Sequence, residues 1–408
     1  MNARQARRQA ASVLQASCIA AVLTGSTSFA ENKLESPWLE KTNLFESGVG
    51  GYAQYRIPGV AVSAKGTLLV YCEARRTGGD WAEIDLLARR STDGGKSWQG
   101  PLRMAEVAGP KPKNPIRKNA NPNEVTYDNP VAIADSNGTF HFLFCLEYMR
   151  CFHQTSDDEG MTWSKPVEIT RAFDGFRSAY DWKVLATGPG HGIQLQSGRL
   201  LVPTWLSLGR GANNHSPSVS SVIFSDDHGQ TWQTGDIAIP ESEESPNANE
   251  AAVVELSDGR VLLNARNHSK AQRRAVTVSS DGGKHWSTPR LQSDLPEPIC
   301  MAGMVRYAPP GQTRYLLFSQ PAPKEIPSGK SGTRENLTVR LSRDDGLTWP
   351  SSKTLEPGPS AYSDLAVLPD GTIVCFYERA KGGSSPYGVL TLARFNLAWL
   401  TDTPSLAK

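Results

Sequence analysis

The chain has 408 residues and a formal net charge of +2 at pH 7, from 43 Lys and Arg against 41 Asp and Glu. This near balance, with no Gly-rich phosphate loop and no basic-aromatic stripe, argues against a nucleic-acid partner. Six cysteines and seven histidines without ligand spacing predict no metal site, and no cofactor is expected.

The first 30 residues have the pattern of a secretory signal. Three arginines in the first eight residues precede a mostly small and apolar stretch at 12–25, and residues 28–30 suit signal peptidase. A lipoprotein signal at Cys18 is an alternative, weakened by Gln15 where an aliphatic residue is wanted. No apolar run is long enough to span a membrane. We expect a secreted or periplasmic protein with a mature domain at 31–408, in which Cys145 and Cys151 could pair.

Five segments repeat the template S-x-D-x-G-x-T-W, which we call Asp boxes. Ser97 and His285 are the only departures in the threonine position. The aspartates can accept backbone N–H groups across a hairpin turn, glycine permits positive φ, and the tryptophan buries a large ring. The five boxes end at Trp98, Trp163, Trp232, Trp286 and Trp349. A structural role accounts for these boxes without any chemistry.

The box aspartates at 93, 158, 227, 281 and 344 lie 65, 69, 54 and 63 residues apart. Each interval has room for about four short strands. Between boxes, apolar runs joined by Asn, Asp or Ser before Gly predict hairpins, as in "AVVELSDGRVLLNA". Over the mature chain this period predicts about six four-stranded antiparallel blades, an all-β propeller. The Pro-rich stretches 108–122 and 321–332 are expected to be loops.

Three arginines interrupt strand-like runs on different predicted blades. Arg56 lies in "QYRIPGVAV", Arg266 ends "VLLNAR", and Arg334 precedes the strand that leads into the last box. Propellers bind ligands where inner strands converge, and three guanidiniums aimed at one point would repel each other without an anion there. Their planar donors suit a carboxylate.

With these arginines, the "YRIP" run, "NEAAVVELSDGRVLLNAR", "AYSDL" and the five boxes, the chain resembles the exo-sialidase (neuraminidase) family of glycoside hydrolases over essentially its whole mature length. The resemblance implies a six-bladed propeller that cleaves terminal sialic acids. It also implies that Arg56, Arg266 and Arg334 clamp the substrate carboxylate, with Arg340 and Arg343 as nearby competitors for the third position.

The family uses a tyrosine nucleophile, and this role falls on Tyr362. A phenol avoids the repulsion that a carboxylate nucleophile would meet from the substrate's own carboxylate. With a reference pKa near 10 it needs a base, which the resemblance places at Glu250 rather than at the turn-flanking Glu255.

Asp80, in "RRTGGDWAEID", matches the acid/base aspartate, which protonates the leaving oxygen and then activates water. Asp85 is the runner-up. Arg75, or else Arg76, matches a further arginine near the carboxylate. Further substrate contacts are expected from Asp128 and Asn129.

The resemblance therefore implies a retaining exo-α-sialidase with a tyrosyl-enzyme intermediate, active as a monomer on sialylated glycoproteins, glycolipids or oligosaccharides. A sialic-acid-binding propeller without turnover is the alternative from another class; it would not require Asp80, Glu250 and Tyr362 together. A trans-sialidase or an enzyme that releases an anhydro sugar keeps the same residues, and linkage preference stays open.

Overall fold

The computed structural model describes residues 34–402 and 405–406, except residue 212 and residues 310–312 and 327–331. The predicted signal at 1–30 lies outside the described residues. In the described part the chain consists of β-strands with only a 3₁₀ helix, η1 (Thr170–Phe176), and a short helix, α1 (Leu397–Thr401). The all-β prediction is confirmed.

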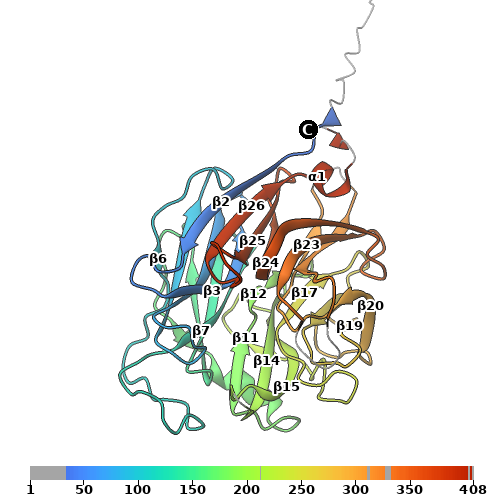
Figure 1. Ribbon diagram of the computed structural model, residues 1–408. Helices are drawn as coiled ribbons and strands as arrows, with labels where there is room; N and C mark the ends of the chain where they lie inside the picture. The colour runs from blue at the N-terminus through green and yellow to red at the C-terminus, as the bar shows by residue number, and fades with distance from the viewer. Residues whose placement is uncertain (1–33, 212, 310–312, 327–331, 403–404, 407–408) are drawn as a thin grey trace, which may run out of the picture.

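Hairpin-connected strands build successive sheets (Figure 1). The first contains β3 (Gln54–Val62), β4 (Leu68–Arg75), β5 (Ile84–Ser91) and β6 (Leu102–Arg103). The second contains β7 (Tyr127–Ala134), β8 (Phe140–Leu146), β9 (Arg150–Ser156) and β10 (Val167–Glu168), with β12 (Gly190–His191) parallel to β7. The third contains β11 (Val184–Thr187), β14 (Leu200–Arg210), β15 (Ser216–Ser225) and β16 (Gln233–Thr234), with β13 (Ile193–Gln194) paired to β14.

The remaining strands form two further sheets and a short pair. One contains β17 (Ala251–Glu255), β18 (Val261–Ala265), β19 (Arg273–Ser279) and β20 (Arg290–Pro296). A seven-stranded sheet contains β21 (Gly303–Tyr307), β22 (Tyr315–Pro321), β23 (Glu335–Ser342), β24 (Ser351–Val367), β25 (Ile373–Arg379), β26 (Val389–Phe395) and β2 (Leu39–Glu46). The pair joins β1 (Leu34–Glu35) to β27 (Ser405–Leu406).

The long strand β24 belongs to two strand groups in turn. Its first half pairs with β23, up to Pro359 opposite Glu335, and its second half pairs with β25, from Ser360 opposite Arg379. At the far edge of this sheet, β2 pairs with β26, so strands from opposite ends of the chain lie side by side (Figure 1).

Apolar clusters lie between each sheet and the next. Leu69 and Tyr71 of the first sheet pack with Phe142 of the second, and similar clusters join the later sheets in order. Another cluster lies within the seven-stranded sheet, between its two strand groups. A further cluster joins the first sheet to the last, with Val70 against Phe376. Burial of these faces is the main stabilising contribution, at about 25 cal/mol per Å² of apolar surface.

All five Asp boxes occupy one structural position, the turn from the third to the fourth strand of a group. In the turn after β15, Asp227 Oδ1 accepts the backbone N–H of Thr231 at 2.8 Å and Oδ2 accepts its hydroxyl at 2.6 Å. The hydroxyl of Ser225 accepts the Gly229 N–H at 2.8 Å. The predicted hydrogen bonds across the turn are therefore present.

Other predictions about the scaffold can also be compared with the structure. The stretch 108–122 contains no helix or strand. The five cysteines of the described chain are buried and free, although Cys145 lies opposite Cys151 on adjacent strands. Among the described residues, no helix has the length and apolar character needed to cross a membrane.

Candidate active site

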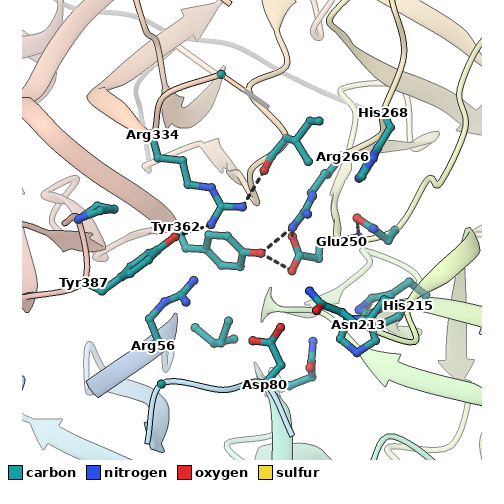
Figure 2. A pocket seen from close by; sticks show the side chains of 18 of the residues that line it. Arg56, Asp80, Asn213, His215, Glu250, Arg266, His268, Arg334, Tyr362 and Tyr387 are labelled. Atoms are coloured by element: carbon teal, nitrogen blue, oxygen red, sulfur yellow. Dashed lines mark hydrogen bonds and ion pairs between the residues drawn. The ribbon is translucent and has the colours of Figure 1, made fainter. Parts of the chain in front are cut away.

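One cavity of about 1070 Å³ collects nearly all of the residues singled out in the sequence. This volume suits a small organic ligand. The predicted residues that line it are Arg56, Arg75, Asp80, Asn129, Glu250, Arg266, Arg334 and Tyr362. They come from several sheets. The close-up shows the polar ends of six of them directed toward a common space: Arg56, Asp80, Glu250, Arg266, Arg334 and Tyr362 (Figure 2).

A β-bulge explains the unusual "YRIP" sequence. The pairing of β3 with β4 shifts register between Arg56 and Gly59, and Ile57 has φ of 61°. Positive φ is unfavourable for a β-branched residue, and such strain is typical of functional sites. The Ile57 N–H leaves the ladder and donates to Glu378 Oε1 at 3.1 Å, which fixes the strand beside the cavity.

The hydroxyl of Tyr362, on β24, lies between a base and a cation (Figure 2). It donates to Glu250 Oε1 at 2.6 Å and accepts from Arg266 Nη1 at 2.7 Å. The same Arg266 nitrogen donates to Glu250 Oε2 at 2.6 Å. Burial raises the pKa of Tyr362 well above 10; the charge of Arg266 lowers it and that of Glu250 raises it. The phenol is therefore neutral at neutral pH, with a proton acceptor already in place.

Two further guanidiniums surround the Tyr362 ring. The Arg56 guanidinium carbon lies 5.3 Å and that of Arg334 lies 5.1 Å from the ring centroid. Arg56 Nε donates to Glu378 at 2.6 Å, whereas Arg334 donates to the Tyr387 hydroxyl at 3.0 Å and the Ile299 carbonyl at 2.8 Å. Because the partners of Arg334 are neutral, its positive charge is available to an anion in the cavity.

Arg75 and Asp80 form an ion pair at the cavity wall. Arg75 Nη1 donates to Asp80 Oδ1 at 2.7 Å, and Nη2 donates to the fully buried Glu73 at 2.6 Å. Burial raises the pKa of Asp80, but the charges of Arg75, His215 and Arg56 outweigh it, so the net pKa lies below its usual value. Asp80 is therefore ionised at neutral pH.

Asp128 is the predicted site residue that the structure does not bring to the cavity wall. Its carboxyl is fully buried, accepts the Tyr148 N–H at 3.0 Å, and has its pKa raised well above the usual value by burial. The next residue, Asn129, has φ of 49° at a bulge before Pro130 and lines the cavity instead. The structure thus gives no support for Asp128 as a sugar contact.

The competitors named in the sequence lie elsewhere. Arg76 stacks on Tyr52, and Asp85 is a residue of β5 bonded to the Tyr52 hydroxyl. Glu255 accepts the Gln196 N–H at the end of β17. Of each pair of alternatives, the residue that we preferred is the one that lines the cavity.

Sequence reasoning missed the carboxylates that hold the site together. Glu378 accepts from Arg56 and from the Tyr362 backbone N–H, and so joins β3 to β24. Glu73 accepts from Arg75 and from the Asn129 N–H. A signal was present, because both glutamates end apolar strands beside an arginine, in "CEAR" and "YER". His215 and Tyr387 also line the cavity, without a comparable signal.

Comparisons with known proteins identify the class of protein to which the chain belongs. Residues 117–375 match the BNR repeat-like domain. The chain is 33% identical, over 97% of its length, to a sialidase of Micromonospora viridifaciens and spans 61% of that protein. It is 30% identical over 84% of its length to Sialidase-2 of Cricetulus griseus and covers 92% of that relative.

A solved structure agrees. Hadza microbial sialidase Hz136 superposes with a TM-score of 0.71 at 25% identity, covering 88% of this chain and 69% of the other. The chain therefore belongs to the exo-sialidase family of glycoside hydrolases.

Proposed function

We propose that the protein is an exo-α-sialidase that hydrolyses terminal sialic acids from glycoproteins, glycolipids or oligosaccharides. The observation that carries this proposal is the Tyr362 hydroxyl, bonded to Glu250 and Arg266 inside a cavity lined by four arginines. Every catalytic group that the two chemical steps require is a side chain of this protein.

The substrate carboxylate binds among Arg56, Arg266 and Arg334. Arg56 and Arg266 are already paired with Glu378 and Glu250, but each guanidinium has further N–H donors. Arg334 has no carboxylate partner among the described residues and contributes an unneutralised charge. A planar anion between these donors receives charge-assisted hydrogen bonds, and this fixes the sugar's anomeric carbon above the phenol.

In the first step, the Tyr362 oxygen attacks the anomeric carbon while its proton passes to Glu250. Arg266 stabilises the negative charge that develops on the phenolic oxygen. The bond to the leaving glycosidic oxygen breaks, and Asp80 supplies the proton for that oxygen. The product of this step is a tyrosyl-linked sugar and a free aglycone.

In the second step, Asp80 removes a proton from water, which attacks the same carbon. The phenolic oxygen leaves and recovers its proton from Glu250. Two displacements at one carbon restore the original anomeric configuration, so the sugar is released with retention.

Substrate binding prepares Asp80 for the first step. The charges of Arg75 and Arg56 help to hold its pKa down. A bound carboxylate neutralises part of this positive charge, and the sugar excludes water from an aspartate whose side chain is otherwise 36% exposed. Both changes favour the protonated acid.

We further infer a six-bladed propeller. Four separate sheets each supply one group of four strands, and the seven-stranded sheet supplies two more groups that share β24. The apolar clusters between consecutive sheets, and between the last and the first, support a closed ring of these six groups.

The signal-like pattern of residues 1–30 supports export, and we propose that the enzyme acts as a monomer outside the cytoplasm.

The test is release of 4-methylumbelliferone from its α-sialoside, with NMR of the first sugar anomer formed and Tyr362→Phe as the matched control. We expect release by the wild-type protein and the α anomer first. The β anomer first would contradict the tyrosyl intermediate. Tight binding of free sialic acid without release would favour the binding-propeller alternative, and an anhydro or transferred sugar would redefine the product.

A further inference from the structure

The loop that carries Asp80 is exposed before this residue and more closely packed from this residue onward. Residues 76–79 are exposed, and Gly78 and Gly79 offer no side chains for packing. Residues 80–83 are half-buried. The first large side chain after the two glycines is Trp81, which directly follows Asp80 and does not itself line the cavity.

The Trp81 ring is held by residues from three other segments. Its centroid lies 4.6 Å from that of Tyr148, after β8, and 5.7 Å from His215, before β15. The Arg117 guanidinium lies 4.8 Å from the ring centroid. The indole Nε1 donates to the Asn213 carbonyl at 3.0 Å. Tilted aromatic contacts, a cation over the ring and a hydrogen bond together fix the ring in one place.

The other anchor of Asp80 depends on its charge. Arg75 Nη1 binds Asp80 Oδ1 at 2.7 Å, and this attraction requires an ionised carboxylate. A general acid acts in its neutral form, in which the ion pair is lost. The anchor through Trp81 is independent of the charge on Asp80, so it persists in the protonation state that donates to the leaving oxygen.

We propose that Trp81 is a positioning residue that holds protonated Asp80 against the glycosidic oxygen. This inference rests on the proposed function, because it assigns Trp81 a part only in the proton-transfer step. Binding of the sugar carboxylate and attack by Tyr362 do not depend on it.

The test compares two substrates that differ in their need for an acid. The oxygen of sialyllactose must be protonated as it leaves, whereas 4-nitrophenolate leaves with little assistance. In Trp81→Ala we expect kcat/KM for sialyllactose to fall by about 10²-fold and that for 4-nitrophenyl sialoside by no more than about 3-fold. Trp81→Phe, which keeps a ring and loses the indole N–H, should lie between Trp81→Ala and the wild type and covers a failure of Trp81→Ala to fold.

A double-mutant cycle supplies the control. In the Asp80→Ala background, Trp81→Ala should add less than about 2-fold for either substrate, because the acid that it positions is already absent. Equal losses on both substrates, or a full additional loss without Asp80, would overturn the proposal. If the wild-type protein releases sugar from neither substrate, the proposed function itself fails, and that outcome is distinct from equal losses in an active enzyme.

Discussion

Carboxylates at the Asp boxes and in the cavity differ in where their partners come from. Asp227 accepts from Ser225 and Thr231, within four residues of its own position. Glu250 binds Tyr362, 112 residues away, and Glu378 binds Arg56, 322 residues away. A short motif determines the first kind of site, whereas the second exists only once separate sheets have packed together.

The electrostatic consequences are opposite as well. Hydrogen bonds from the Thr162 hydroxyl and backbone lower the pKa of Asp158 in its box to about 2. Glu73, by contrast, is fully buried, and burial raises its pKa despite Arg75. Hydrogen bonds within the box therefore stabilise its ionised carboxylate, whereas the ionised form of the buried Glu73 depends mainly on the charge of Arg75.

The largest effect should come from the cavity. Tyr362→Phe removes one hydroxyl and with it the nucleophile between Glu250 and Arg266, so kcat should fall by about 10²–10⁴-fold. The ring packing remains, and the thermal midpoint should stay within about 2 °C of the wild type. Steady-state kinetics and calorimetry on the same preparation check both. Unchanged turnover would exclude Tyr362 as the nucleophile.

Substitutions of two cavity arginines should affect protein stability and sialic acid binding differently. Arg75→Ala leaves the buried Glu73 without its cation, and the free energy of unfolding in urea should fall by about 3–5 kcal/mol. Arg334→Ala removes a guanidinium whose partners are neutral. It should cost less than about 1 kcal/mol of stability but weaken sialic acid binding by about 10–100-fold. Equal stability losses would contradict this division.

At a box, the same kind of substitution should affect stability alone. Asp227→Ala removes several local hydrogen bonds and should lower the free energy of unfolding by about 1–2 kcal/mol, with kcat/KM unchanged. The neighbouring Asp226→Ala is the matched control. It breaks an exposed ion pair with Arg199 and should cost at most about 1 kcal/mol. A larger loss of stability for Asp226→Ala than for Asp227→Ala would contradict a stabilising role for the box aspartate.

A pH-dependent effect, absent at neutral pH, should arise where this turn meets the second sheet. Gly229 of the box packs on His141 and His153, and their rings stack beside Asp135. Burial, then the charge of His141, lowers the pKa of His153 from 6.5 to about 3. Below about pH 6.5 the unfolded chain binds a proton at this histidine that the folded protein does not. The free energy of unfolding therefore decreases as the pH is lowered, by up to about 1.4 kcal/mol per pH unit.

His153→Gln should remove this contribution. Neighbouring groups that also titrate or carry charge, Asp135, His141, Asp157 and His228, remain in the variant. Urea unfolding at pH 7, 6, 5 and 4 should show a shallower loss of stability in the variant than in the wild type. Parallel curves would mean that His153 is not the group responsible.

The sequence predicted the periodic parts of this molecule well. Box spacing and hairpin signals gave the strands, and the arginines near strand ends were correctly expected to share one space. It could not reveal that Glu378 joins β3 to β24, or that Trp81 packs on Tyr148. Those contacts depend on how separate sheets face each other, which no local pattern encodes.

Asp128 shows the same limit at a single residue. "YDNP" and "YRIP" look alike, and both runs contain a bulge before proline. The longer Arg56 side chain reaches the cavity from its bulge, while the short Asp128 carboxyl stays beneath the surface and binds Tyr148. Side-chain length, together with the surrounding packing, therefore determines which of the two residues lines the cavity.

The pairing of β2 with β26 has a consequence for biosynthesis. Next to this pair, Ser47 binds the carbonyl of Tyr387, 340 residues further along. During synthesis on the ribosome, β2 is made early, and its edge stays unpaired until nearly the whole chain has been translated. Such long-range pairing is slow because a large loop must close first. Until then the edge of β2 is a site for mispairing with other chains, so protection of the nascent polypeptide should raise the yield of active protein.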